Sequence, residues 1–552
     1  MSIILITIFI LFSIKLLRDS LFCVWLWQVK EYRIDRMISH LKGRNRMLKN
    51  NLFYILILIL FVSYFIFLKN NASLFQYLAL ILFTGSFLQI IREIKNRSLK
   101  RPKSTFKVIL ILLSMLIVYA SAFLYSIIIG YVITFDSNIS TAEFFTIYSL
   151  FVYLFAPIVI TLVVLFINPF FNFQKRKIIK RASEKMEQLK KIKVIGITGS
   201  YGKTSTKEFL YTILSEKYKV VKTEGNNNTN IGVAYTILNK VNDEYDYFIC
   251  EMGAYKIGEI KEICGIANPE IGILTGINEQ HIELFGSIEN TRTAKFELIE
   301  FLPDDGFAII NKKIKNYKPE TKVQSIKYFS KELATDIEYK KDHIEFRYKN
   351  QLFKTNILGQ HYIENIISAI MVAEHLEMNL SEIARAVEKI KPTEYIMRKL
   401  NGPNGSVLID DSYSANPDGV MAALDYLEEA YEDYRKIIVF SGIIELGDKS
   451  KRVHQKLFNR IDTVCDEAYI LNDDLKNTIL IFLERGIEEE EMVEESNGPK
   501  NKNCEFVFEN DFDKVTEMVE KDLKFYFEKR EKIVVLFESR GAGVVMRKLK
   551  NN

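Results

Sequence analysis

Long apolar runs fill the chain up to about Pro169, and they predict helices that cross a membrane. The runs lie at about 2–28, 51–68, 72–91, 107–134 and 144–170. Each of the last four is long enough for the roughly 20-residue helix that a bilayer requires. After them, charge and helical periodicity are typical of a soluble protein. The sequence therefore predicts a transmembrane domain of four or five helices over residues 1–172, followed by soluble domains.

The first apolar run has two interpretations, because Lys15, Arg18 and Asp19 interrupt it. It is either a span with a polar notch, or a short span followed by an interfacial helix that contains Trp25 and Trp27. A signal peptide is not predicted, because the N-terminus lacks a basic region and no small-residue cleavage site follows.

Basic residues gather in alternate connections between the apolar runs. They are Lys30, Arg33, Arg36, Lys42, Arg44, Arg46 and Lys49, then Arg92, Lys95, Arg97, Lys100, Arg101 and Lys103, and finally Lys175, Arg176, Lys177, Lys180 and Arg181. The positive-inside rule places these three segments, and the soluble part after them, in the cytoplasm. The net charge of +5 is therefore a sign of membrane topology and not of nucleic-acid binding.

Residues 173–191 are predicted to form an amphipathic, basic connecting helix near anionic headgroups. The membrane helices either serve only as a tether, or also form a groove for a lipid substrate or a surface for a partner. The five cysteines are scattered and form no C-x-x-C pair. This pattern suits a reducing compartment and argues against a structural zinc site.

A glycine-spaced turn follows the first strand of the soluble part. From Val194 the chain reads V-I-G-I-T-G-S-Y-G-K-T-S-T, which combines an apolar strand, three glycines and a helix from about 204 to 214. This order predicts a P-loop, in which backbone N–H groups and a helix N-terminus hold phosphate oxygens. The predicted ATP-binding residues are Gly199, Ser200, Tyr201, Gly202, Lys203, Thr204 and Ser205. The alternative is a tight turn with an exposed lysine, since position 197 is Ile and departs from the strict spacing.

Polar residues also follow the next two predicted strands. The strand at about 247–250 ends at Glu251, and a carboxylate at the carboxyl end of a parallel strand beside a P-loop is a predicted Mg²⁺ ligand. The strand at about 271–277 leads to His281 and to a helix that carries Lys295. Taken alone, His281 would be a structural histidine and Lys295 a solvated lysine.

Strands and helices alternate in the C-terminal part, which predicts a mostly parallel, Rossmann-like α/β domain. The predicted strands are at about 405–410, 436–441, 466–471 and 532–537, and the predicted helices are near 417–431, 449–461, 473–485 and 511–527. Two-residue alternation at 336–339 and 344–348 predicts a β-hairpin. The predicted fold class is thus an α-helical transmembrane domain followed by α/β domains.

The order of motifs from about Ile192 to Lys548 resembles the Mur ligase family, and within it the ligases that add D-alanyl-D-alanine (MurF-like). The matching stretches are T-G-S-Y-G-K-T-S-T, T-E-G-N-N-N-x-x-I-G, E-M-G-A, H-x-x-x-F-G-S-x-E, A-K-x-E, D-D-S-Y-S-A-N-P-D and S-R-G. The resemblance implies a central ATP-binding domain at 192–392 and a C-terminal domain at 393–552. The membrane domain stands where the family normally has a UDP-binding domain.

The resemblance also implies roles for single residues. Mg²⁺ would be held by Thr204, Glu251, His281 and Lys295, the last as a carbamate, and Lys203, Lys295 and His281 would be catalytic. The nucleotide would also contact Asn365, Arg398 and Asp411, and the substrates would contact Asn226, Asn228, Asn416, Asp418 and Arg540. At His361 a capped core helix is an equal alternative to an adenine contact, and at Arg540 the alternative is a surface salt bridge.

The implied reaction is ATP-dependent amide formation. A substrate carboxylate attacks the γ-phosphate of ATP to give an acyl phosphate, and an amine then displaces phosphate, with two Mg²⁺ ions neutralising charge. We therefore predict a membrane-embedded, cytoplasm-facing ligase of cell-wall peptide precursors, with a UDP-linked or lipid-linked acceptor. An archaeal pseudomurein ligase and a polyglutamate-type ligase are alternatives within the family. A membrane P-loop NTPase for transport or assembly, and a degenerate binding module, are alternatives of other classes.

Overall fold

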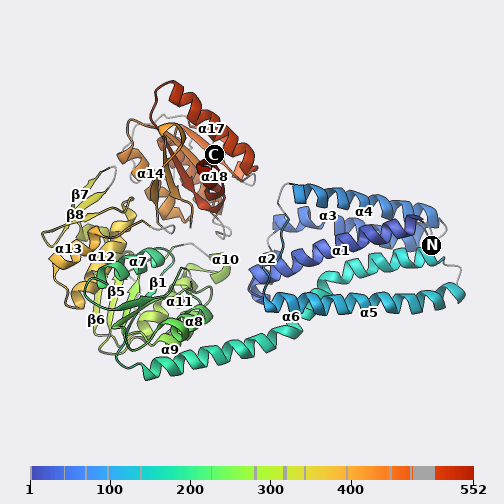
Figure 1. The fold of residues 1–552 in the computed structure, drawn as a ribbon, viewed down its shortest axis with the longest axis horizontal. Helices are drawn as coiled ribbons and strands as arrows, with labels where there is room; N and C mark the ends of the chain where they lie inside the picture. The colour runs from blue at the N-terminus through green and yellow to red at the C-terminus, as the bar shows by residue number, and fades with distance from the viewer. Residues whose placement is uncertain are drawn as a thin grey trace. The chain divides into compact units, whose positions relative to one another are not determined.

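The computed structural model describes residues 3–42, 44–68, 71–95, 99–136, 140–225, 227–278, 282–314, 320–340, 343–392, 396–413, 415–443, 446, 450–472, 475–476 and 504–551. The chain folds into two compact units that divide at Lys177 and Ile178 (Figure 1). The first unit is helical, and the second contains two α/β domains.

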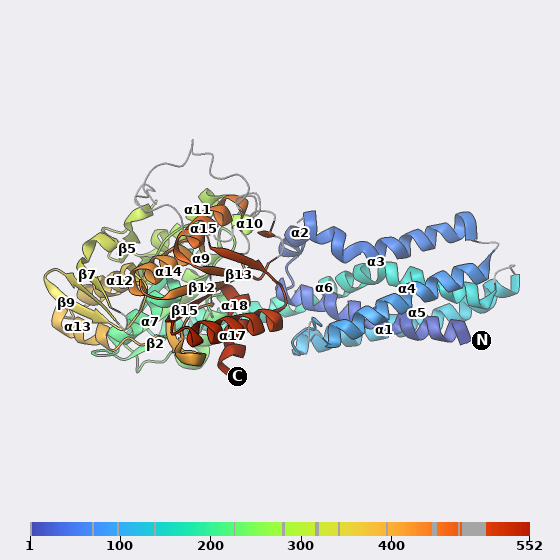
Figure 2. The same cartoon turned by 90° about the horizontal axis from the view of Figure 1, so that it is seen from above.

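The helical unit contains α1 (Ile3–Val29), α2 (Ile34–Lys42), α3 (Arg44–Ser63), a π-helical turn (Tyr64–Leu68), α4 (Ala72–Lys95), α5 (Phe106–Asp136) and most of α6 (Thr141–Gln188). The long helices of this unit run alongside one another in both Figure 1 and Figure 2. Buried apolar side chains from α1, α3, α4 and α6 form one core cluster, and those from α1, α2, α5 and α6 form a second. The apolar runs therefore fold into a packed bundle.

Three helices among the described residues are long and apolar enough to cross a membrane, namely Ala72–Lys95, Phe106–Val132 and Thr141–Gln188. The predicted number is four or five, and the difference has two causes. The run at 51–68 gives only a shorter apolar helix, Leu52–Phe67. The run at 2–28 forms the continuous helix α1, which includes three charged residues.

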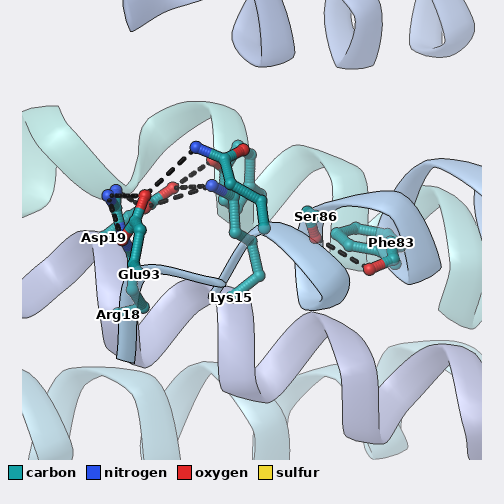
Figure 3. A network of polar contacts seen from close by, with 8 residues as sticks. Lys15, Arg18, Asp19, Phe83, Ser86 and Glu93 are labelled. Atoms are coloured by element: carbon teal, nitrogen blue, oxygen red, sulfur yellow. Dashed lines mark hydrogen bonds and ion pairs between the residues drawn. The ribbon is translucent and has the colours of Figure 1, made fainter. Parts of the chain in front are cut away.

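The charged residues of α1 are paired inside the bundle (Figure 3). Arg18 donates to both carboxylate oxygens of Glu93 on α4 at 2.7 Å, and to Asp19 at 2.7 Å. Lys15 Nζ lies 3.2 Å from Asp19 Oδ2, and the Tyr153 hydroxyl of α6 donates to the same oxygen. The positive charges of Lys15 and Arg18 balance the negative charges of Asp19 and Glu93. The polar notch of α1 is thus a neutral network that joins three helices, which is how charges are tolerated away from water.

We expect Arg18→Ala to destabilise the helical unit by about 1–3 kcal/mol, because Glu93 then loses its bidentate cation in a largely buried position. The double variant Arg18→Ala/Glu93→Ala should be more stable than the single variant, because it removes both charges. The chain's two tryptophans, Trp25 and Trp27, both lie on α1. Thermal unfolding in detergent, followed by tryptophan fluorescence, therefore reports on this unit. A single variant as stable as the wild type would show that the network has no stabilising role.

The middle domain begins at β1 and ends at α13. It contains β1 (Lys193–Thr198), α7 (Lys203–Leu214), β2 (Val220–Lys222), α8 (Asn230–Lys240), β3 (Tyr247–Glu251), α9 (Glu259–Ala267), β4 (Ile271–Leu274), α10 (Ile282–Phe285), α11 (Ile288–Phe301), β5 (Phe307–Asn311), β6 (Ser325–Phe329), β7 (Thr335–Tyr339), β8 (Ile344–Tyr348), β9 (Gln351–Thr355), α12 (His361–His375) and α13 (Leu380–Glu388). Short 3₁₀ turns lie at Lys312–Ile314 and Lys331–Leu333. The first six strands form a parallel sheet of order β2-β3-β1-β4-β5-β6, with β1 near its centre.

Alternate residues of the strands enter two different cores, as parallel strands covered on both faces must. Ile195 and Ile197 of β1 pack with α7 and α12, whereas Val194 packs with α8, α9 and α11. Ala182 and Met186 on the last part of α6 join the second core. The predicted connecting helix is therefore continuous with the preceding apolar helix, and its second half packs on the middle domain.

The predicted hairpin is confirmed, because β7 and β8 pair antiparallel. A third strand, β9, pairs with β8 and is not among the predicted strands. It is short, and its alternation is hard to distinguish from a loop in sequence. Apolar side chains of this small sheet, such as Phe346 and Phe353, pack into the core that also contains α12 and α13.

The C-terminal domain contains β10 (Arg398–Asn401), a 3₁₀ turn (Pro403–Gly405), β11 (Val407–Asp411), α14 (Pro417–Ala430), β12 (Arg435–Phe440), α15 (Ser450–Val464), β13 (Glu467–Ile470), β14 (Glu505–Phe508), α17 (Phe512–Glu528), β15 (Ile533–Glu538) and α18 (Ser539–Asn551). The sheet order is β10-β11-β15-β12-β13-β14, with only β10 antiparallel. Helices α14 and α15 cover one face, and α17 and α18 cover the other. The mostly parallel α/β prediction is confirmed, while most of the helix predicted near 473–485 lies outside the described residues.

Candidate active site

The glycine-spaced turn joins the carboxyl end of β1 to α7. Gly202 has a φ of 74°, in the left-handed region, and precedes the first residue of α7. A Cβ atom at this position would lie 2.7 Å from Oδ1 of Asn365 on α12. Only glycine therefore allows this backbone conformation and this close approach together. The Ser200 N–H also ties the turn to the end of β4, by donating to the Gly276 carbonyl at 2.7 Å.

Lys203 and Ser200 direct polar groups into the turn. Lys203 Nζ donates to the carbonyls of Gly199 at 2.7 Å and Ser200 at 3.2 Å. Burial lowers the pKa of this lysine. The Ser200 hydroxyl is buried and has no hydrogen-bond partner among the described residues. An ammonium group, an unpaired hydroxyl and a helix N-terminus together suit an anion such as a phosphate.

Glu251 lies at the centre of a hydrogen-bonded cluster beside the turn. Its Oε1 accepts from the Thr204 hydroxyl at 3.2 Å and from Asn228 Nδ2 at 2.9 Å. Its Oε2 lies 2.9 Å from Nζ of Lys207, which also donates to the Gly225 carbonyl at 2.6 Å. The cluster thus joins α7, the loop after β2, and β3. Of these residues, Thr204, Asn228 and Glu251 are predicted from the sequence.

Lys207 is a further residue of the candidate site, and none of the sequence motifs marks it. Its side chain is 0% exposed, and that of Glu251 is 1% exposed. Lys207 follows Lys203 by four residues on α7, so the two lysines lie on one face of the helix. Two features of the sequence point to Lys207. It follows Lys203 by four residues, and it stands close to Phe209 and Leu210, apolar residues that are buried in α7.

Lys295 lies on α11 with only 3% of its surface exposed. Its Nζ has a single acceptor among the described residues, the Ala254 carbonyl at 3.4 Å. Burial, and then the charge of Lys203, hold the pKa of Lys295 well below its usual range. Glu297, two residues later, accepts from the N–H groups of Gly258 and Lys261 and so holds the start of α9. The A-K-x-E stretch therefore supplies one buried amine and one carboxylate that fixes a loop.

The residues around Glu251 fit a divalent cation of the Mg²⁺ type. The Thr204 hydroxyl and one Glu251 carboxylate oxygen are 3.2 Å apart, and oxygen is the ligand that Mg²⁺ prefers. Within the described ranges, no cluster of three or more His, Cys, Asp or Glu side chains is placed to hold a metal. The remaining ligands would have to come from phosphates, water or His281, which lies outside the described residues, as does Asn226.

A hydrogen bond between a loop residue and the first turn of α14 joins the middle domain to the C-terminal domain. Asn278, after β4, donates to Asp418 Oδ2 at 3.1 Å. Burial, and then the charges of Asp418 and Glu364, raise the pKa of Tyr201 in the glycine-spaced turn. Asn416 caps α14, because its side chain accepts from the Gly419 N–H at 3.1 Å. The N-P-D part of the motif is thus a helix start that places Asp418 beside the turn.

The other predicted residues of the C-terminal domain lie at the carboxyl edge of its sheet. Arg398 is bound to Asp410, with contacts of 2.9 and 3.1 Å. Asp411 is the next residue, at the end of β11. Arg540 is exposed, and its Nε donates to the Tyr413 carbonyl at 3.5 Å. Among the described residues, the structure places Lys203, Thr204, Glu251, Asn228 and Asn365 together at the glycine-spaced turn.

Known proteins match the second unit of the chain. The family model for the Mur ligase middle domain matches residues 197–373, and the model for the Mur ligase glutamate ligase domain matches residues 394–537. The UDP-N-acetylmuramoyl-tripeptide–D-alanyl-D-alanine ligase of Rickettsia prowazekii is 30% identical over 325 residues, which are 56% of this chain and 70% of that protein. The chain belongs to the Mur ligase family.

Other Mur ligases match it over similar lengths. The ligase of the same name from Bacillus subtilis is 31% identical over 271 residues, which are 48% of this chain but only 59% of that protein. A MurF structure from Acinetobacter baumannii covers 68% of this chain and 81% of its own, with a TM-score of 0.59 at 23% identity. A Thermotoga maritima MurF ligase in complex with ADP covers 68% and 82%, with a TM-score of 0.56 at 25% identity. The two α/β domains thus have the Mur ligase fold.

Proposed function

We propose that this protein is a membrane-embedded, ATP-dependent ligase that adds D-alanyl-D-alanine, or a related amine, to a cell-wall peptide precursor. The proposal rests on one observation. Lys203, Thr204 and Glu251 lie together beside the glycine-spaced turn, in which Gly202 has a left-handed backbone conformation. It is supported by relatives named UDP-N-acetylmuramoyl-tripeptide–D-alanyl-D-alanine ligase. The ligase domains would be residues 192–392 and 393–552.

In this proposal the glycine-spaced turn is a P-loop that binds the phosphates of ATP. The backbone from Gly199 to Ser205 would surround the β- and γ-phosphates, and Lys203 would leave the two carbonyls that it now contacts. Asn365, which touches the turn, would contact the base or sugar. Arg398 and Asp411 would approach from the C-terminal domain. Domain closure would then exclude water, as an acyl phosphate requires.

The cation site of the proposal is built around Thr204 and Glu251, with His281 and Lys295 as further ligands. Mg²⁺, when bound, would neutralise charge on the phosphates and on the acyl phosphate. The low pKa of Lys295 favours its neutral amine, the form that reacts with carbon dioxide to give a carbamate. A carbamate is an anionic oxygen ligand, which a lysine ammonium is not.

The protein's own residues would orient the two substrates. Asn226 and Asn228 would hold the peptide whose carboxylate attacks the γ-phosphate. Asn416 and Asp418 would shape the opposite wall of the site. Arg540 would hold the carboxylate of the incoming amine through its planar pair of N–H donors. The amine nitrogen forms the new bond to the acyl carbon, and phosphate leaves with the electron pair.

The helical unit would hold the ligase at the cytoplasmic face of the cell membrane. Three of its helices are long and apolar enough to span, and the basic connections place the soluble part inside by the positive-inside rule. The acceptor would then be either UDP-linked or carried on a membrane lipid. A single helix suffices for a tether, so the packed bundle favours a further role.

The first test of the proposal is phosphate release by the full-length, detergent-solubilised protein. We expect release from ATP to require both a tripeptide precursor and D-alanyl-D-alanine, because the acyl phosphate is protected from water until an amine arrives. UDP-linked and lipid-linked precursors should be compared in parallel. Release that ignores the amine would indicate a membrane NTPase instead. Release with glutamate as the only active amine would indicate a polyglutamate-type ligase.

A further inference from the structure

Asp411 has a buried acidic neighbour, Glu538, that the proposed mechanism does not use. The two residues end β11 and β15, which are parallel neighbours, and they are directly in register. Their side chains therefore project from the same face of the sheet, and a hydrogen bond joins the two carboxyl groups. Glu538 is 1% exposed, and its Oε1 has no hydrogen-bond partner among the described residues.

Among the residues that the structure describes, the groups that face this carboxyl pair offer no positive charge to it. Asp410, beside Asp411 on β11, is already neutralised by Arg398 at 2.9 Å. On β12 the residue in register with Glu538 is Phe440, which is apolar. From α12 the buried Tyr362 faces the pair, and burial and then the Asp411 and Glu538 charges raise the pKa of its hydroxyl. Glu538 is buried and Asp411 beside it is half-buried. Two neighbouring carboxylates in such a place, without a cation, cannot both ionise, so the pair retains a proton.

Burial assigns that proton to Glu538. Burial, followed by the charge of Asp410, raises the pKa of Asp411 to about 7, while the hydrogen bond from Glu538 opposes this rise. Burial and the Asp411 charge raise the pKa of Glu538 well above its usual range. Just above neutral pH, Glu538 is therefore the acid that donates, and Asp411 is the carboxylate that accepts.

The pair lies close to the glycine-spaced turn and is held rigidly. Tyr362, which faces the pair, and Asn365, which touches Gly202, are one turn apart on α12. Ser539, directly after Glu538, has a φ of 76° and accepts a hydrogen bond from the Ser441 N–H at 2.9 Å. A serine in the left-handed region is strained, and such strain is retained where the surroundings fix a functional group.

We propose that Glu538 is a positioning residue, which keeps the proton of the pair and donates it in a hydrogen bond, so that Asp411 remains charged and oriented toward the bound nucleotide. This inference rests on the proposed function, because Asp411 is there an ATP contact. Protonation of Asp411 removes the charged acceptor. ATP affinity should therefore fall as the pH decreases through about 7.

The test is the pH dependence of MgATP binding to the full-length protein in detergent, measured by calorimetry from pH 6 to 9. Glu538→Leu removes the donor, so the midpoint of the affinity change should move up by about one pH unit, with roughly tenfold weaker binding between the two midpoints. Glu538→Gln retains a donor and should keep the wild-type midpoint. The titration of ATP itself is common to all variants. A wild-type midpoint in Glu538→Leu, or an equal shift in both variants, would overturn the proposal.

Two further measurements keep the test decisive. Glu531→Gln changes an exposed carboxylate just before β15 and should leave the midpoint unchanged. Infrared spectroscopy at pH 8 should detect a protonated carboxylic acid in the wild type that Glu538→Gln lacks, and its absence from the wild type would reject the proposal. This signal needs no nucleotide. A protein that shows it but does not bind ATP would refute the proposed function and leave the proton assignment intact.

Discussion

Replacing Lys203 with alanine is expected to reduce amine-dependent phosphate release by about a thousandfold or more. Lys203 Nζ lies within the glycine-spaced turn and contacts two of its carbonyl oxygens. In the proposed reaction it would stabilise the charge that develops on the transferred phosphate, in a site with little water. A positive charge in such a site is worth far more than one in solvent. The measurement is phosphate release with saturating precursor and D-alanyl-D-alanine.

The matched control is Lys217→Ala, because Lys217 lies three residues after α7 and is exposed. Its Nζ donates to the Glu377 carbonyl at 2.8 Å and lies 5.3 Å from the centroid of the Tyr218 ring. Its replacement should leave the rate within about twofold, as is usual for surface substitutions. Both variants should retain the wild-type unfolding temperature. If Lys203→Ala kept a tenth or more of the rate, the turn would not be the phosphate site.

Replacing Lys207 with alanine is expected to destabilise the middle domain by about 3–5 kcal/mol, because it leaves the Glu251 carboxylate buried without its cation. The Lys207 Nζ to Glu251 Oε2 distance is 2.9 Å, and both side chains are almost completely buried. For a domain of this size the change corresponds to a fall of roughly 10 °C in unfolding temperature. Circular dichroism of the full-length protein in detergent would measure it. Tryptophan fluorescence, which reports on α1, should not change.

Two variants separate the charge effect from loss of packing. Lys207→Met/Glu251→Gln removes both charges at similar volume and should recover most of the lost stability. Lys222→Ala breaks an ion pair with Glu208 at 21% and 15% exposure, and should cost about 1 kcal/mol or less. If Lys207→Ala were no worse than Lys222→Ala, the buried pair would not be a stabilising element. The double variant should still be inactive, because it lacks the proposed cation ligand.

Local sequence patterns account for much of the fold. The apolar runs correspond to helices of the first unit, and the strand before the glycines is β1. The sequence pattern places Gly202 in the turn, where its left-handed backbone favours glycine, whereas the helix-capping role of Asn416 appears only in the structure. The missed elements, such as β9, β10 and β14, are strands of four or five residues, too short for a clear periodicity.

The residues of the candidate site divide in a similar way. Lys203, Thr204 and Glu251 are predictable, because a turn and a strand end place them by local geometry. Lys207 and Glu538 are not, since each is defined by a partner that is far away in the chain. Lys207 lies 44 residues from Glu251 in the chain. Glu538 meets Asp411 only because β11 and β15 are neighbours in the sheet.

The sequence alone determined most of the long helices, several strands and the glycine-spaced turn, because these depend on neighbours within a few residues. It also determined that basic residues gather in alternate connections between the apolar runs. Only the tertiary structure decided which charges meet and which are buried. A carboxylate in water keeps its charge and its usual pKa, but one enclosed by two packed strands or helices must find a cation or keep a proton. The Glu251 carboxylate has the Lys207 cation as its partner, whereas Glu538 keeps its proton beside Asp411.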